Sequence, residues 1–98
     1  MMEEVVYYNN LYDLYGDLLT TKQRQYFEDY YFNNLSFSEM ADNYNVSRNA
    51  VFKQIHIVTN KLEEYEKKLG LLKRKEKLMK LIVSVDDKKL KEKLEELI

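Results

Sequence analysis

An unbroken apolar stripe in the middle of the chain constrains the fold more than any other feature of the sequence. Its members follow one another at alternating spacings of four and three residues: Val51, Ile55, Val58, Leu62, Tyr65 and Leu69. This spacing places all of them on one face of an α-helix. Ser47 is a favoured N-cap residue, and Gly70 readily adopts the left-handed backbone that ends helices. The pattern therefore predicts one long helix over residues 48–69.

The rest of the chain also favours helices over strands. It holds no proline and two glycines among 98 residues, whereas all-β folds rely on both residue types in their turns. Apolar periodicity and cap residues predict further helices over residues 3–15, 21–32, 37–43 and 71–83, and a last one after Asp87. We expect Gly16 to end the first helix in a left-handed conformation. The sequence thus predicts an all-α protein.

Residues 37–56 have the layout of a helix-turn-helix, in which a short turn joins two helices. Ser36 and Glu39 form an S-x-x-E capping box that starts the first helix. Ala41 supplies the small residue needed where two helices touch, and Asn45 tolerates the positive φ that the turn needs. Val46 is expected to fill the turn as an apolar plug. We therefore expect a helix-turn-helix domain over residues 1–70, followed by a basic, amphipathic helical extension over residues 71–98.

The second helix of this motif carries the candidate nucleic-acid-binding residues. With Val51 and Ile55 facing inward, its cap residue and outward face comprise Ser47, Arg48, Asn49, Phe52, Lys53 and His56. In a DNA-bound helix-turn-helix, the N-terminal part of this helix reaches base edges. There Arg pairs with guanine and Asn with adenine. Phe52 is available to stack on a base or to dock a partner.

Charge is distributed unevenly along the chain. Residues 1–35 hold six acids and two bases, residues 36–70 hold five of each, and residues 71–98 hold six acids and nine bases. A basic cluster lies in the last segment: Lys73, Arg74, Lys75, Lys77 and Lys80. Two interpretations are open for it. It is either a secondary contact for phosphate or RNA, or the solvated face of an amphipathic helix.

Several functional classes are excluded by what the sequence lacks. With no cysteine and one histidine, it offers no disulfide, no thiol nucleophile and no metal-ligand set. We expect no cofactor and no enzymatic activity. Glu63, Glu64 and Glu66 are predicted to form a solvated face, with i, i+4 pairs such as Glu63–Lys67 and Glu64–Lys68. No apolar run approaches the ~18 residues of a membrane span, and residues 1–10 do not resemble a signal peptide. A cytoplasmic protein without membrane insertion is expected.

Five segments resemble a known family in their order along the chain. They are residues 19–23 (LTTKQ), 30–31 (YY), 35–41 (LSFSEMA), 46–51 (VSRNAV) and 65–71 (YEKKLGL). Together they resemble the YlxM family of small bacterial proteins, whose helix-turn-helix is similar to the fourth region of sigma factors. The family's genes tend to lie beside those of the signal recognition particle GTPases. The resemblance implies an accessory or regulatory role in that targeting pathway, through the particle's RNA or its GTPase. The alternative is a transcriptional regulator that reads promoter DNA through residues 47–56.

The long helix and the C-terminal helix both carry apolar residues that need cover. We expect the first three helices to cover only the early part of the long helix, which leaves Leu62, Tyr65 and Leu69. The last helix adds a second stripe of Leu90, Leu94, Leu97 and Ile98. Either the C-terminal helices fold back onto the long helix, or two chains pack as a symmetric homodimer. The homodimer is preferred because the N-terminal domain is small.

Overall fold

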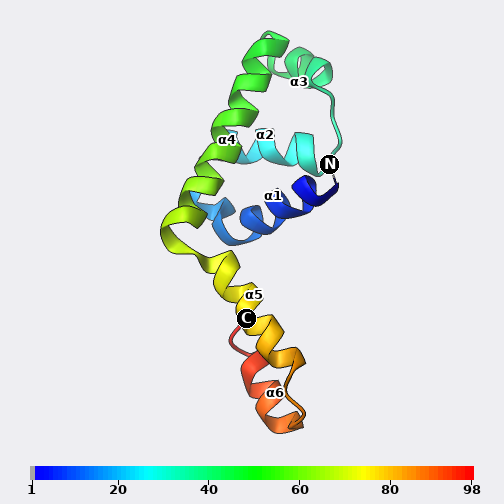
Figure 1. Ribbon diagram of the computed structural model, residues 1–98. Coiled ribbons are helices and arrows are strands. Elements are labelled where there is room, and N and C mark those ends of the chain that lie inside the picture. Colours follow the sequence, from blue (N-terminus) through cyan, green and yellow to red (C-terminus); the bar gives the residue numbers. More distant parts are fainter. Residues whose placement is uncertain (1) are drawn as a thin grey trace.

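The computed structural model describes residues 2–98 and contains only helices and their connections over that range (Figure 1). The elements in chain order are α1 (Met2–Tyr15), a short 3-10 helix η1 (Gly16–Leu18), α2 (Thr21–Tyr31), α3 (Phe37–Tyr44), α4 (Arg48–Leu69), α5 (Leu71–Val83) and α6 (Lys88–Glu95). The all-α fold expected from the sequence is confirmed. None of the described helices is both long and apolar enough to cross a membrane.

Side-chain caps explain where these helices begin. Thr20 and Gln23 form a capping box at the start of α2, and Ser36 and Glu39 form the predicted one at the start of α3. The Ser47 hydroxyl accepts the N–H of Ala50 and so caps α4, as expected. Each cap satisfies backbone donors that a helix N-terminus leaves without an internal partner. The starts of these helices therefore coincide with cap residues that the local sequence supplies.

The two glycines end helices for different reasons. Gly70 has φ 63° and ends α4 in the left-handed conformation, as predicted. α1 also ends before Gly16, but Gly16 does not adopt positive φ, so that part of the prediction is wrong. A Cβ at Gly16 would lie 3.1 Å from the Tyr12 ring. A side chain at this position would require the Tyr12 ring to shift by a few tenths of an ångström.

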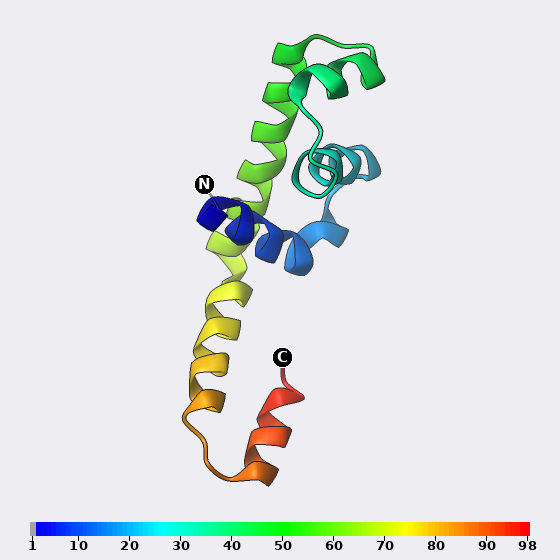
Figure 2. The same cartoon turned by 90° about the vertical axis from the view of Figure 1, so that its right-hand side faces the viewer.

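α4 is the spine on which the other helices of the N-terminal part pack (Figures 1 and 2). α1, α2 and α3 each contact it. Near its start, one core cluster contains Tyr26, Met40, Ala41, Val51 and Ile55. Near its end, a second cluster contains Leu11, Tyr12, Tyr15, Leu19, Phe27, Val58, Leu62 and Leu72. The core is thus divided along the length of one helix.

The cover of α4 differs from the expectation at its C-terminal end. Leu62 is fully buried beneath α1, together with Leu11 and Tyr15, so the first helices cover more of α4 than predicted. Leu69 remains exposed. The fold-back onto α4 is also wrong: α5 leads away from the N-terminal helices, and α6 turns back along α5 (Figure 2). The molecule is consequently elongated, at 56 × 24 × 22 Å.

Candidate nucleic-acid interface

The turn between α3 and α4 is fixed by backbone hydrogen bonds around a left-handed residue. Asn45 has φ 54°, as predicted. The N–H of Val46 donates to the carbonyl of Ala41 at 3.0 Å, and that of Asn45 donates to Asp42 at 3.4 Å. This is the pairing of a Schellman motif. The Val46 side chain is 42% exposed, so it does not plug the turn. Its backbone N–H holds the turn instead.

The packing of α3 against α4 sets the direction of the candidate recognition helix. Ala41 is 6% exposed and belongs to the same core cluster as Val51 and Ile55 of α4. Tyr26 of α2 closes this cluster from the side. A small residue at this position lets two helices approach closely, as expected. With Val51 and Ile55 buried, the opposite face of the first turns of α4 points to solvent.

All six predicted site residues are exposed: Ser47, Arg48, Asn49, Phe52, Lys53 and His56. Those within α4 follow the i, i+1, i+4, i+5, i+8 spacing of one helical face. Among the described residues, Arg48, Asn49 and Lys53 form no ion pair and no side-chain hydrogen bond. Their donors are therefore available to a ligand. Their role in binding stays a prediction.

The helix-turn-helix as a whole carries as many acids as bases. Glu39 and Asp42 balance Arg48 and Lys53 over this part of the chain. Hydrogen bonds from the backbone N–H and then the hydroxyl of Ser36 lower the pKa of Glu39, so Glu39 is ionised at neutral pH. A polyanion would thus meet a few well-placed cations here and no broad basic field.

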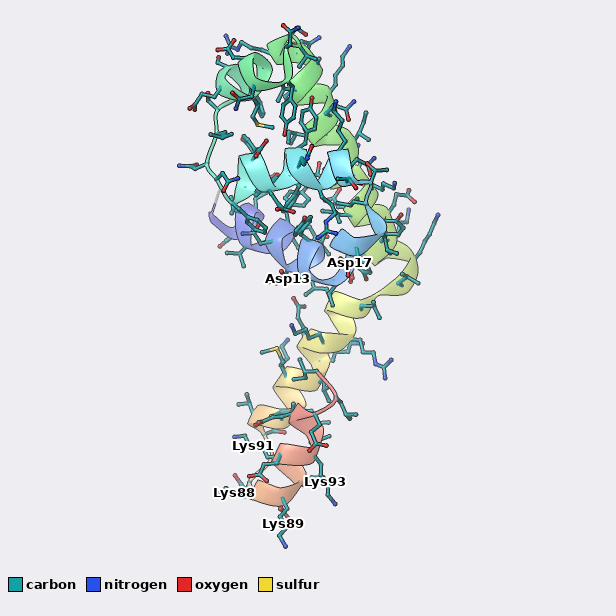
Figure 3. All side chains as sticks on the ribbon, turned by 180° about the vertical axis from the view of Figure 1, so that it is seen from behind. Asp13, Asp17, Lys88, Lys89, Lys91 and Lys93 are labelled. Carbon is teal, nitrogen blue, oxygen red and sulfur yellow. The ribbon has the colours of Figure 1, made fainter. Side chains whose placement is uncertain are left out.

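The predicted basic cluster lies on α5, away from the helix-turn-helix. Its members are all exposed, and Lys73, Lys77 and Lys80 share one helical face at i, i+4 and i+7. Further lysines that the sequence analysis did not single out lie on α6, near the far end of the molecule (Figure 3): Lys88, Lys89, Lys91 and Lys93. The excess of bases over residues 71–98 was the signal that could have identified them.

Glu66 fixes how α5 leaves the N-terminal helices. It accepts the Tyr15 hydroxyl at 2.7 Å, the Leu72 N–H at 3.0 Å and the Lys73 N–H at 3.2 Å. Burial raises the pKa of Glu66, but these hydrogen bonds outweigh burial and leave the pKa below its usual value. The Tyr15 hydroxyl in turn accepts the Leu71 N–H. The predicted solvated role for Glu66 is therefore wrong.

Of the other two carboxylates on α4, one forms its predicted ion pair and the other does not. Glu64 pairs with Lys68 at 3.6 Å, as predicted. Glu63 accepts the Tyr8 hydroxyl at 3.0 Å and forms no ion pair with Lys67 among the described residues. Over the same residues, no group of three or more His, Asp or Glu side chains is placed to hold a metal ion.

An all-α chain in which a tight left-handed turn joins two packed helices is a helix-turn-helix protein. Comparison with known proteins agrees with this class. Residues 2–98 match the family UPF0122, described as "Putative helix-turn-helix protein, YlxM / p13 like". This chain belongs to that family.

Relatives at similar identity come from several bacteria. A UPF0122 protein of Geobacillus kaustophilus is 44% identical over 89% of this chain and 79% of the relative. One of Halalkalibacterium halodurans is 42% identical over 96% of this chain and 90% of the relative. One of Listeria monocytogenes is 40% identical over 88% of this chain and 78% of the relative.

Proposed function

We propose that this protein is a non-enzymatic accessory protein of the signal recognition particle pathway, and that it binds nucleic acid with the outward face of α4. One observation carries the binding role. Arg48, Asn49 and Lys53 lie exposed and without internal partners on adjacent turns of a helix that α3 holds in place. The link to the targeting pathway rests on the resemblance to the YlxM family.

The chemistry of this face suits a small number of specific contacts. Arg48 can bind a guanine edge in a bidentate manner, and Asn49 an adenine edge. Lys53, one turn further along, is placed for a phosphate. Because phosphate contacts supply most nucleic-acid affinity, a face with two cations gives modest affinity and a shallow dependence on salt. Particle RNA, which offers unpaired bases as well as phosphates, suits such a face better than a long uniform duplex.

The basic cluster on α5 and the α6 lysines provide a second contact, which extends along the α5–α6 hairpin. The molecule is 56 Å long, with the start of α4 at one end and the α5–α6 hairpin at the other (Figure 1). A duplex would need about 16 base pairs, at ~3.4 Å each, to run along this length. We propose that a ligand touching both surfaces binds more tightly and with a steeper salt dependence than one touching α4 alone.

The second candidate function is a transcriptional regulator. It is favoured by the position of Arg48 and Asn49 at the start of α4, where helix-turn-helix proteins read base edges. In this case the ligand would be promoter DNA, and binding would depend on sequence. The two candidates share a surface and differ in the ligand, so one experiment can separate them.

Affinity measurements with the full chain test the shared surface. The probes are the particle's RNA, an unrelated structured RNA of equal length and a DNA duplex. Arg48→Ala with Lys53→Ala is expected to weaken binding about tenfold or more. Lys67→Ala with Lys68→Ala removes the same charge from the exposed end of the same helix and is expected to have little effect. Reversal of Lys73, Arg74 and Lys75 to Glu is expected to lower affinity and reduce its salt dependence.

Crosslinking in cells, followed by sequencing of bound RNA and DNA and mass spectrometry of bound proteins, identifies the ligand. Enrichment of the particle's RNA supports the accessory role, and enrichment of promoter DNA supports the regulator. Recovery of the pathway's GTPase alone, unchanged by nuclease, would contradict nucleic-acid binding. Equal weakening by both double variants would show that the α4 face is not the contact.

A further inference from the structure

Six aromatic rings form a continuous chain of contacts beside the candidate interface. In order of contact they are Tyr8, Tyr31, Tyr30, Phe37, Phe52 and His56. Each ring centroid lies 4.9–5.9 Å from the next. The rings come from α1, α2, α3 and α4, so the tertiary fold brings them together. Phe52 and His56 also belong to the predicted nucleic-acid-binding face.

These rings line a cavity of about 270 Å³. Glu4 and Val5 of α1, with Ile55 and Thr59 of α4, complete its wall. The volume is below the ~300–1,000 Å³ of pockets that hold drug-sized ligands. The cavity is therefore of a size for a single flat ring system. Phe52, 46% exposed, lies on the side that faces solvent.

The polar groups of the wall suit the edge of a heterocycle. The Glu4 carboxylate can accept from an exocyclic amine or a ring N–H, and the His56 imidazole can donate or accept. Burial raises the pKa of Tyr31 to about 12, so its hydroxyl stays protonated at neutral pH. An aromatic wall with a few hydrogen-bonding groups is how proteins hold unpaired bases.

We propose that this cavity binds one unpaired nucleobase of the nucleic acid that the α4 face holds. The inference rests on the proposed function and adds the recognition of an unpaired base. Arg48 and Lys53 lie on the same three turns of α4 as Phe52 and His56. They are thus placed to neutralise the phosphates on either side of an inserted base. An apolar side chain of a partner protein fits less well, because it would make no use of the hydrogen-bonding groups that Glu4 and His56 bring to the wall.

Two RNA hairpins of equal length test the inference, one with a single unpaired adenine and one fully paired. Wild-type protein is expected to bind the first more tightly. Phe52→Ala is expected to weaken binding of the unpaired probe by about 5- to 150-fold, the range for loss of one base–aromatic stack. Binding of the paired probe should change little. Phe52→Trp, which keeps an aromatic face, is expected to restore the preference.

Ile57→Ala is the matched control. Ile57 lies on the same helix with a similar exposed fraction, 49%, but outside the cavity. A fluorescent adenine analogue at the unpaired position gives a direct readout, since stacking on Phe52 should quench it in wild type and not in Phe52→Ala. Thermal melts of each variant establish that it is folded. A DNA hairpin of the same sequence distinguishes an RNA base from a DNA base.

The outcomes separate this inference from the proposed function. Equal affinity for paired and unpaired probes, with both weakened by loss of Arg48 and Lys53, would show that the cavity does not bind an unpaired base. The proposed function would remain in place. Failure of every probe to bind would overturn the function as well. A Phe52→Ala effect that is the same on both probes, with no quenching, would show that Phe52 contacts the ligand without stacking on an unpaired base.

Discussion

Four tyrosine hydroxyls donate hydrogen bonds to carboxylates on other helices. The pairs are Tyr8 with Glu63, Tyr12 with Glu28, Tyr15 with Glu66, and Tyr44 with Asp29. The rings of these residues pack in or beside the two core clusters while their hydroxyls reach acids at the rim. Tyrosine suits this position because one end is apolar and the other polar. These four tyrosines thus serve both the core and its hydrogen bonding.

Local residue roles were predictable from the sequence, and distant pairings were not. The caps at Ser36 and Ser47 and the left-handed Asn45 depend on neighbours within a few residues, so the sequence predicted them correctly. The tyrosine–carboxylate pairs join residues 15 to 55 positions apart. Charge spacing along α4 could not reveal them, which is why Glu66 was assigned to a solvated face.

Replacement of Glu66 by Gln is expected to destabilise the folded chain at neutral pH. The change removes the charge that accepts the Tyr15 hydroxyl and two N–H groups at the start of α5, at a cost of about 1–3 kcal/mol. Because the folded-state pKa of Glu66 lies below its usual 4.5, its stabilisation is complete above that pH. It is lost as pH falls through the lowered folded-state pKa.

Urea unfolding of wild type and Glu66→Gln at a series of pH values measures this effect. The difference in free energy of unfolding should be greatest near neutral pH and shrink below about pH 4.5. Glu64→Gln removes a carboxylate that forms only an exposed ion pair with Lys68, and it should cost little. A difference that does not change with pH would contradict a role for the Glu66 charge.

At the scale of elements, apolar periodicity predicted where the helices lie. It did not predict which helices pack against one another. The stripe from Val51 onward identified α4 and the buried face of all but its last turn, and Ser47 and Gly70 identified its bounds. It could not show that α1 covers Leu62, because periodicity reports which face is apolar and not what packs on it. The helix-turn-helix was the exception. There the turn is so short that sequence neighbours α3 and α4 must also be packing neighbours.

Replacement of Ala41 by Leu is expected to loosen the packing of α3 on α4. Ala41 is buried among Met40, Val51 and Ile55, and overpacking at such a site costs about 1–3 kcal/mol. The melting temperature should fall by several degrees. Ala50→Leu, at a partly exposed position of α4, is the control and should melt close to wild type. An Ala41→Leu protein that melts like wild type would show that the helices do not touch at this residue.

At the scale of the whole molecule, acidic and basic residues gather in different parts of the elongated structure. The acidic helix α1 lies in the N-terminal part, and the basic α5–α6 hairpin projects from it. Asp13 and Asp17 lie near the base of that part, and the α6 lysines near the far end of the hairpin (Figure 3). The division into a domain of residues 1–70 and an extension of residues 71–98 stays a prediction. Leu72 belongs to the N-terminal core, which ties the first turn of α5 to it.

The α5–α6 hairpin exposes several large apolar residues. A groove of about 530 Å³ is lined by Leu14, Leu71, Leu78, Leu81, Leu97 and Ile98, and at its edge by Arg74, Lys75 and Lys77 of the basic cluster. Val83, at the end of α5, is 80% exposed. Apolar residues gathered in this way mark a contact surface more often than a free one. Charge complementarity indicates the partner: the basic hairpin of one chain suits the acidic N-terminal part of a second copy.

We therefore expect an antiparallel homodimer in which the two hairpins lie side by side. In that arrangement the lysine-rich end of each hairpin reaches the base of the partner's N-terminal part, where Asp13 and Asp17 lie, while the apolar grooves face each other. Sedimentation equilibrium should give about twice the monomer mass of 11.9 kDa, and high salt should weaken the association because exposed charges contribute to it. Leu81→Glu with Leu97→Glu should give monomers, whereas Ile57→Glu, an exposed site on α4, should not. A single 11.9 kDa species at high micromolar concentration would contradict the homodimer. The groove would then be a surface for other ligands only.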